Sequence, residues 1–202
     1  MEAKVIKDSS NIIDRRREEI LNVALREFSR KGYSGTRVSD IAKKSRISQG
    51  LVYHYYNSKE DLYLAVSNRV VEVCEELTYI ISTSKIRGWQ GLLALTEEVI
   101  DWIINNDHRL FILCFLHQIS ILESKPCDKY TLRKENEILI VIKRLICEGQ
   151  KEGKIIMGKD DLLGRMYWSV IQCIIINKVM GNDKEYGVED LNPLMLLRGL
   201  RN

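Results

Sequence analysis

The residues best suited to chemistry lie in one short stretch, "SQGLVYHYYN", at positions 48–57. Its first half places a hydroxyl, an amide and a glycine in consecutive positions, Ser48, Gln49 and Gly50. Its second half is aromatic, because residues 53–56 are three tyrosines and a histidine. Successive side chains point in different directions in a helix or a strand, so these aromatic residues cannot all face one core. Some of them are therefore expected to be available to a partner.

The distribution of charge indicates an anionic partner for the front of the chain. Residues 1–60 hold 13 Lys or Arg against 8 Asp or Glu, a net charge of +5, whereas the remaining residues hold 18 against 20. A positive segment attracts anionic surfaces. The whole chain is 45% hydrophobic and 29% charged, which is typical of a globular protein and argues against wholesale disorder.

Cysteine usage and hydropathy indicate a cytoplasmic protein. The five cysteines are scattered and form no C-x-x-C pair, which favours reduced thiols over a disulfide framework. The longest apolar runs, such as residues 138–142, are far too short to span a bilayer. The first 17 residues lack the continuous apolar core of a signal peptide.

The elements that position the opening stretch are predicted to be helices. Only two prolines occur, and apolar residues recur with helical spacing while no convincing period-2 segment is found. Gly32 has the position of a helix-ending glycine, Thr36 and Ser48 are candidate N-caps, and Ser58 with Asp61 forms a capping-box-like start. We expect an all-α fold with about nine helices, over residues 15–31, 37–45, 49–55, 58–82, 89–105, 107–122, 128–152, 161–181 and 189–200.

Two short helices joined by a tight turn, over residues 37–45 and 49–55, have the dimensions of a helix-turn-helix. Such a unit inserts its second helix into the DNA major groove, with the first turn of that helix facing the base edges. Gln49 can bond those edges, adenine most readily, and Gly50 allows the backbone to approach the DNA. Ser48 and the free amides at the helix start can hold a phosphate.

The aromatic residues suit the far end of that second helix. The hydroxyls of Tyr53 and Tyr55 can reach phosphates while their rings pack against the neighbouring helix. Lys59, at the start of the fourth helix, is a further phosphate partner. Val52 and Tyr56 are expected to face inward, and the plain alternative for the whole cluster is a packed helix end.

Residues 20–62, "ILNVALREFSRKGYSGTRVSDIAKKSRISQGLVYHYYNSKEDL", resemble the N-terminal domain of the tetracycline-repressor-like (TetR) transcriptional regulators. A long ordered series of matches is a more specific signal than any single short motif. The chain length and the number of expected helices also fit that family. The matching residues are Ala24, Phe28, Gly32, Tyr33, Thr36, Val38, Asp40, Ile41, Ala42, Ser48, Gly50, Tyr53, His54, Tyr55, Ser58 and Lys59.

The resemblance implies a homodimeric repressor that a small-molecule effector releases from a partly palindromic operator. A DNA-binding domain at residues 1–60 is expected, followed by a larger ligand-binding and dimerisation domain at residues 61–202. The effector is expected to change the spacing of the two DNA-binding domains through the fourth helix. Carried over by position, the DNA-facing residues are Arg37, Ser39, Ser48, Gln49, Gly50, Leu51, Tyr53, His54, Tyr55 and Lys59.

Two residues depart from the family pattern. Arg46 occupies the turn position where family members usually have glycine, and a non-glycine residue at positive φ costs about 1 kcal/mol. The turn must therefore tolerate that strain or adopt a different shape. Leu51 stands where the family usually has a small or polar residue, and its natural contact would be a thymine methyl group.

The second half of the chain offers candidate effector-binding residues, although each alone is also a plausible core residue. Large aromatic residues and polar residues on apolar helices form this set: Trp102, Phe111, Cys114, Phe115, His117, Gln118, Trp168 and Gln172. Cys114 and His117 have i, i+3 spacing, but two ligands without a third are a weak indication of metal. The strongly apolar helices expected over 161–181 and 189–200 suit a dimer interface of four helices.

Other functional readings have less support. The sequence has no G-x-S-x-G, H-E-x-x-H or phosphate-loop motif, so we expect neither catalysis nor a cofactor. Arg15, Arg16 and Arg17 form either an arm that contacts DNA or a solvated run of charge. The main alternative function is a helix-turn-helix adaptor that is regulated by protein contact, without a small ligand.

Overall fold

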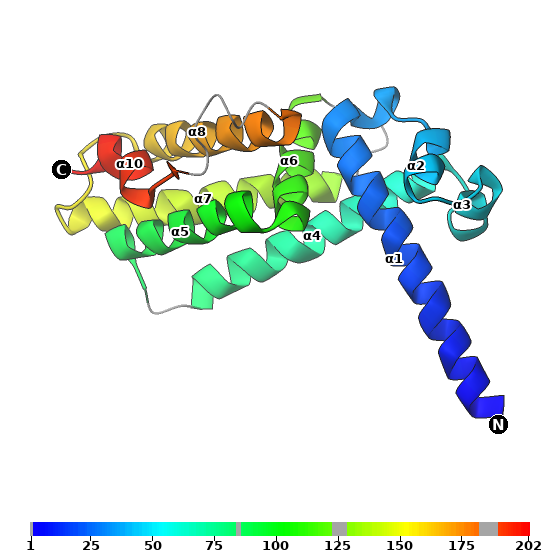
Figure 1. The fold of residues 1–202 in the computed structure, drawn as a ribbon. Coiled ribbons are helices and arrows are strands. Elements are labelled where there is room, and N and C mark those ends of the chain that lie inside the picture. The colour runs from blue at the N-terminus through cyan, green and yellow to red at the C-terminus, as the bar shows by residue number, and fades with distance from the viewer. Residues whose placement is uncertain (1, 84–85, 123–128, 182–189) are drawn as a thin grey trace.

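The computed structural model describes residues 2–83, 86–122, 129–181 and 190–202, and it is helical (Figure 1). Helices α1, α2 and α3 lie at one end of the molecule, which we call the head, and α5 to α10 form the body (Figure 1). The all-α prediction is confirmed. The described helices are α1 (Glu2–Gly35), α2 (Val38–Lys44), α3 (Gln49–Tyr55), α4 (Lys59–Thr83), α5 (Gly88–Asn105), α6 (Asp107–Leu122), α7 (Lys129–Lys151), α8 (Asp160–Met180), α10 (Pro193–Leu197) and the 3₁₀ turn η2 (Arg198–Leu200).

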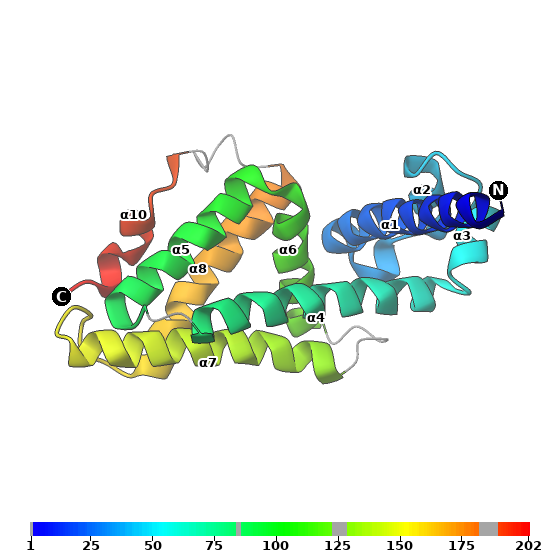
Figure 2. The same cartoon turned by 90° about the horizontal axis from the view of Figure 1, so that it is seen from below.

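Helix α4 connects the two parts of the molecule. Its first half packs on α1 in the head, and it then crosses α6 and lies along α7 in the body (Figure 2). Because α4 belongs to both parts, the domain boundary near residue 60 stays a prediction. Within the described residues, no helix combines the length and the apolar character needed to cross a membrane.

Each helix of the head contributes to an apolar core that continues into the body. Phe28 of α1 and Ile41 of α2 are fully buried. Val52 of α3 and Tyr56 directly after it are also buried, so the prediction that both face inward is confirmed. The Tyr56 hydroxyl donates to the carbonyl of Arg17, 3.4 Å away, and thereby satisfies its polar end.

The two ends of α1 differ in how well the sequence predicts them. Gly32 has φ 68° and ψ 177°, so the regular helix is interrupted at the predicted glycine. The predicted start near Arg15 was wrong, because α1 begins at Glu2 and projects beyond α2 and α3 (Figure 1). Residues 2–14 contain neither proline nor glycine, so no residue there breaks the helix.

The helix caps follow the sequence at α3 and α4 but not at α2. Ser48 accepts a hydrogen bond from the Leu51 amide, and Ser58 accepts one from the Asp61 amide, as predicted. The prediction that Thr36 caps α2 was wrong. Arg37 is the N-cap residue, while the Thr36 hydroxyl lies 2.8 Å from the carbonyl of Gly32 and 3.2 Å from that of Glu27. Thr36 thus satisfies carbonyls at the end of α1 instead.

The body is a bundle in which α5, α6 and α8 pack together with α7. A buried hydrogen bond of 2.8 Å joins the hydroxyls of Thr96 on α5 and Tyr167 on α8. The last predicted helix is shorter than expected, since α10 starts at Pro193, and residue 189 lies outside the described part. The chain end pairs with the segment after α7 through Ile155 and Arg201. The four described cysteines are free thiols, and Cys127 lies outside the described residues.

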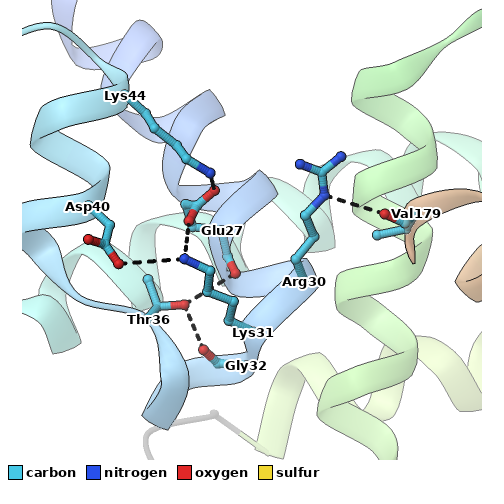
Figure 3. A network of polar contacts seen from close by, with 8 residues as sticks. All are labelled: Glu27, Arg30, Lys31, Gly32, Thr36, Asp40, Lys44 and Val179. Atoms are coloured by element: carbon cyan, nitrogen blue, oxygen red, sulfur yellow. Dashed lines mark hydrogen bonds and ion pairs between the residues drawn. The ribbon is translucent and has the colours of Figure 1, made fainter. Parts of the chain in front are cut away.

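A buried carboxylate joins α1 to α2 (Figure 3). The Glu27 side chain is 1% exposed and forms ion pairs with Lys44 of α2 and, at 2.9 Å, with Lys31. Lys31 also lies 3.5 Å from Asp40 of α2. Burial alone would raise the pKa of the Glu27 carboxyl, but the hydrogen bonds and positive charges of Lys44 and Lys31 outweigh it and lower that pKa.

Glu27→Gln is expected to lower the free energy of unfolding by about 1–3 kcal/mol near neutral pH, because a buried charge-assisted contact is lost. The native pKa of Glu27 is lowered, so its contribution is present above the unfolded-state pKa of about 4.3. The contribution is lost as the pH falls through the native value. Urea unfolding between pH 7 and pH 3 measures the effect.

Glu19→Gln is the matched control, because Glu19 also pairs with basic side chains but its side chain is 44% exposed. Its effect should stay below about 1 kcal/mol. A difference between wild type and Glu27→Gln that did not shrink toward pH 3 would contradict the assigned role of this carboxylate.

Candidate nucleic-acid interface

The turn between α2 and α3 fixes the geometry of the predicted interface. Arg46 has φ 55° and is the one non-glycine residue with positive φ in the part of the chain that the structure describes. Its amide donates to the carbonyl of Lys43 at 3.1 Å, and the Ile47 amide donates to that of Ala42 at 3.0 Å. The turn therefore tolerates arginine in the left-handed region, at a cost of about 1 kcal/mol that these bonds offset.

The first turn of α3 is presented to solvent. Ser48, Gln49 and Gly50 are exposed, and the Leu51 side chain is 36% exposed. The Ser48 hydroxyl accepts a hydrogen bond of 3.2 Å from the Leu51 amide, which fixes the start of the helix. Arg37 and Ser39, at the start of α2, are exposed as well. This turn thus offers an amide, a hydroxyl and an apolar side chain that the fold does not bury.

Gly50 has no visible role inside the protein. A Cβ atom built at this position would meet nothing closer than the Ser48 hydroxyl oxygen, 4.0 Å away. Its φ is not positive, so the backbone does not require glycine either. Alanine is preferred to glycine within helices by about 1 kcal/mol. A reason for glycine at this position is therefore expected outside the chain, in the close approach of a partner.

The aromatic cluster divides into exposed and packed members. Tyr53 is 42% exposed and His54 is exposed, whereas Tyr55 is half-buried against the head core. The rings of His54 and Tyr55 meet edge to face, with centroids 5.5 Å apart. Tyr56 is the buried anchor already described. The cluster therefore offers two outward rings and one tyrosine that is partly held by packing.

Lys59 is held against the head by the ring of Tyr33, which is not among the predicted DNA-facing residues. Its ammonium lies 4.3 Å from the centroid of the Tyr33 ring, and burial lowers the pKa of Lys59. The Tyr33 ring also packs edge to face on Tyr63. The contact depends on the change of direction at Gly32, which residue spacing alone does not reveal.

Three of the predicted effector-binding residues contact the head helix α1. The carbonyl of Ser29 accepts hydrogen bonds from the Gln118 amide group and, at 3.4 Å, from the Cys114 thiol. Burial raises the pKa of the Cys114 thiol to about 12, so the thiol keeps its proton for donation. The Ser29 hydroxyl donates in turn to the carbonyl of Phe111 at 2.9 Å. The structure thus brings Phe111, Cys114 and Gln118 together at the junction of head and body.

The other predicted effector-binding residues lie elsewhere in the body. The Phe115 ring is buried and packs on Tyr63, with centroids 5.1 Å apart. The Trp102 indole donates to Glu98 at 2.6 Å. Trp168 is 3% exposed, and its indole nitrogen makes no hydrogen bond within the described residues. His117 and Gln172 are half-buried. Whether these residues line an effector site stays a prediction.

A cavity of about 240 Å³ lies between α1, α4 and α6. Its lining is polar and contains none of the predicted effector-binding residues. An ion pair of 2.5 Å between Glu18 and Arg69 joins α1 to α4 at this cavity. Burial, and next the charge of Arg69, lower the pKa of His108. The lining residues are Glu18, Asn22, Arg26, Arg69 and His108.

Comparison with known proteins connects this architecture to transcription regulators. Residues 20–66 match the family described as "Bacterial regulatory proteins, tetR family". The chain is 27% identical over 196 residues to the fatty acid metabolism regulator protein of Bacillus subtilis, a match that covers 91% of this chain and 95% of that protein. It is 26% identical over 151 residues to the transcriptional repressor NicS of Pseudomonas putida, covering 74% and 68% respectively.

Solved structures share the fold at low sequence identity. The ketosteroid transcriptional regulator KstR2 of Mycobacterium tuberculosis superimposes with a TM-score of 0.71 at 19% identity, over 93% of this chain and 95% of that one. AibR, in complex with isovaleryl coenzyme A and operator DNA, gives a TM-score of 0.67 at 17% identity, over 88% and 98%. Residues 20–66 therefore match the DNA-binding domain of the tetR family of bacterial regulatory proteins, and the whole chain shares the fold of solved transcriptional regulators.

Proposed function

We propose that this protein is a homodimeric repressor that binds a partly palindromic operator and leaves it when a small-molecule effector binds the body. The observation that carries the proposal is the exposed first turn of α3, where the fold leaves room for a side chain but the residue is Gly50. In a helix-turn-helix this turn faces the base edges of the major groove.

The exposed residues of the head divide by chemistry into two groups. Gln49 is suited to hydrogen bonding with base edges, and Leu51 to apolar contact with a thymine methyl. The remaining residues are suited to phosphates, either as hydroxyl and imidazole donors or as cations. They are Arg37, Ser39, Ser48, Tyr53, His54, Tyr55 and Lys59. Because phosphate contacts supply much of the affinity, operator binding should weaken steeply with salt.

An exposed apolar stripe on α8 supports a dimer. Leu162, Met166 and Val170 recur at i, i+4 and i+8, and their exposed fractions are 55%, 56% and 49%. Leu194 and Met195 of α10 are also exposed. Such a stripe invites a partner, and a second copy of the same helices would cover it symmetrically as a four-helix bundle. A dimer would place two heads on one operator.

The relatives indicate which effectors to test first. AibR was solved with isovaleryl coenzyme A, and the Bacillus subtilis relative is named for fatty acid metabolism. In this chain the buried indole N–H of Trp168 has no hydrogen-bond acceptor within the described residues, and buried polar groups usually have one. An effector with an acceptor group could supply it. Short acyl coenzyme A thioesters are therefore the first compounds to test for release of the operator.

Gly50→Ala separates the proposed DNA contact from folding. The variant should unfold at the same or a higher urea concentration than wild type, because alanine favours the helix. Its operator affinity should fall at least about tenfold, since the added methyl group keeps the backbone from the DNA. Titration of fluorescent operator DNA from the region beside the protein's own gene measures the affinity.

Gly199→Ala is the matched control, because a Cβ at Gly199 likewise meets nothing within 4 Å and the residue lies far from the head. It should leave the operator affinity unchanged. Wild-type affinity in Gly50→Ala would rule out close approach of DNA at this turn.

Met166→Glu tests the proposed dimer. The side chain is exposed, so the protomer should keep its fold, whereas two carboxylates at a symmetric apolar interface should weaken dimerisation at least about a hundredfold. Light scattering coupled to size exclusion measures the mass. Ile140→Glu, at an exposed apolar position on α7, is the control that should remain dimeric. If Met166→Glu keeps the mass of a dimer, α8 is not the interface.

A further inference from the structure

Between α1 and α6, polar and cation–π contacts lie beside an apolar core that is continuous from head to body. On α1, Arg26, Ser29 and Arg30 lie on one face, and they meet Phe111 of α6. The guanidinium groups of Arg26 and Arg30 lie 5.1 and 5.2 Å from the centre of the Phe111 ring. The orientation of the head therefore depends on this shared apolar packing together with specific polar contacts.

Arg30 makes a further contact, which reaches a third helix. Its Nε donates to the carbonyl of Val179, 3.3 Å away, in the last turn of α8. Figure 3 shows the Arg30 side chain extending from α1 toward Val179. The last four carbonyls of a helix lack intrahelical donors and carry partial negative charge. The Gly181 amide donates to the carbonyls of Asn177 and Lys178, the two residues before Val179, whose own carbonyl accepts from Arg30.

We propose that Arg30 is a positioning residue that fixes the head on the end of α8, so that head spacing in the dimer is set through α8 as well as α4. The proposal rests on the proposed function, because only a dimer on DNA has a head spacing. Helix α4 and the contacts of Ser29 with α6 already attach the head to the body. The contact of Arg30 adds a third attachment, to α8.

Helix α8 is well placed to supply this further attachment. It is a continuous helix of 21 residues, and the exposed stripe from Leu162 to Val170 lies on the same rigid element as Val179. A shift of α8 at the proposed dimer interface would therefore displace the carbonyl that Arg30 holds. In this way the packing of two protomers would act on the orientation of each head.

The neighbouring Arg26 provides a matched control. It lies one turn earlier on α1 and stacks on the same Phe111 ring at nearly the same distance. Its ion-pair partner is Asp107 of α6, at 3.6 Å, and both side chains are about half-exposed or more. Arg26 and Arg30 thus share their helix, their charge and the aromatic contact, whereas the described contact with α8 belongs to Arg30.

The test is binding-site selection from DNA in which the half-sites and the spacer between them are both varied. For wild type, the affinity for the best spacer is compared with that for a spacer one base pair longer. In Arg30→Gln this ratio should fall at least about fivefold toward 1, which corresponds to one lost hydrogen bond. The selected half-site sequence should not change.

Arg26→Gln should keep the wild-type spacer ratio. An unchanged ratio in Arg30→Gln would overturn the proposal, and so would an equal loss in both variants, because stacking on Phe111 would then explain the effect. A wild-type protein that selects no DNA would contradict the proposed function and, with it, the role of Arg30. That outcome differs from one in which the wild type selects an operator but Arg30→Gln leaves the spacer ratio unchanged.

Discussion

The placement of α2 and α3 on α1 depends on one buried carboxylate. Glu27 of α1 pairs with Lys44 at the end of α2 and with Lys31, which in turn approaches Asp40 of α2. An uncompensated buried charge is costly, so the carboxylate constrains where α2 can lie. Because the turn at Arg46 joins α2 to α3, this constraint extends to the first turn of α3. The position of the exposed residues therefore follows from an interaction inside the head.

The head and the body are joined by two kinds of contact. The apolar core continues across the junction through the rings of Phe28, Tyr63 and Phe115. Polar contacts lie beside it: the hydrogen bonds of the Ser29 carbonyl, two arginines over one ring, and the Glu18–Arg69 ion pair at a cavity. Close-packed cores resist deformation, and buried polar groups such as Ser29 are costly to leave without partners. The junction thus fixes the head on the body through both packing and hydrogen bonds.

The sequence predicted the elements better than their contacts. Helical periodicity located the described helices, Gly32 marked the interruption of α1, and Val52 and Tyr56 were correctly assigned to the core. Thr36 was misassigned, because its hydroxyl reaches back to carbonyls of α1 that are near only in the folded chain. The period of α6 indicated a buried face, but it could not reveal that Cys114 and Gln118 meet α1. Contacts between distant segments depend on packing angles that spacing does not encode.

The central claim is that the first turn of α3 contacts DNA bases, whereas the aromatic residues at its other end contact the phosphates of the DNA backbone. Binding-site selection with Gln49→Ala beside Tyr55→Phe tests it most directly. The account predicts that Gln49→Ala changes the preferred base at one position of each half-site. Tyr55→Phe should keep the wild-type sequence preference and weaken binding to all sequences by a similar factor. An unchanged base preference in Gln49→Ala, with a uniform loss of affinity, would contradict the account.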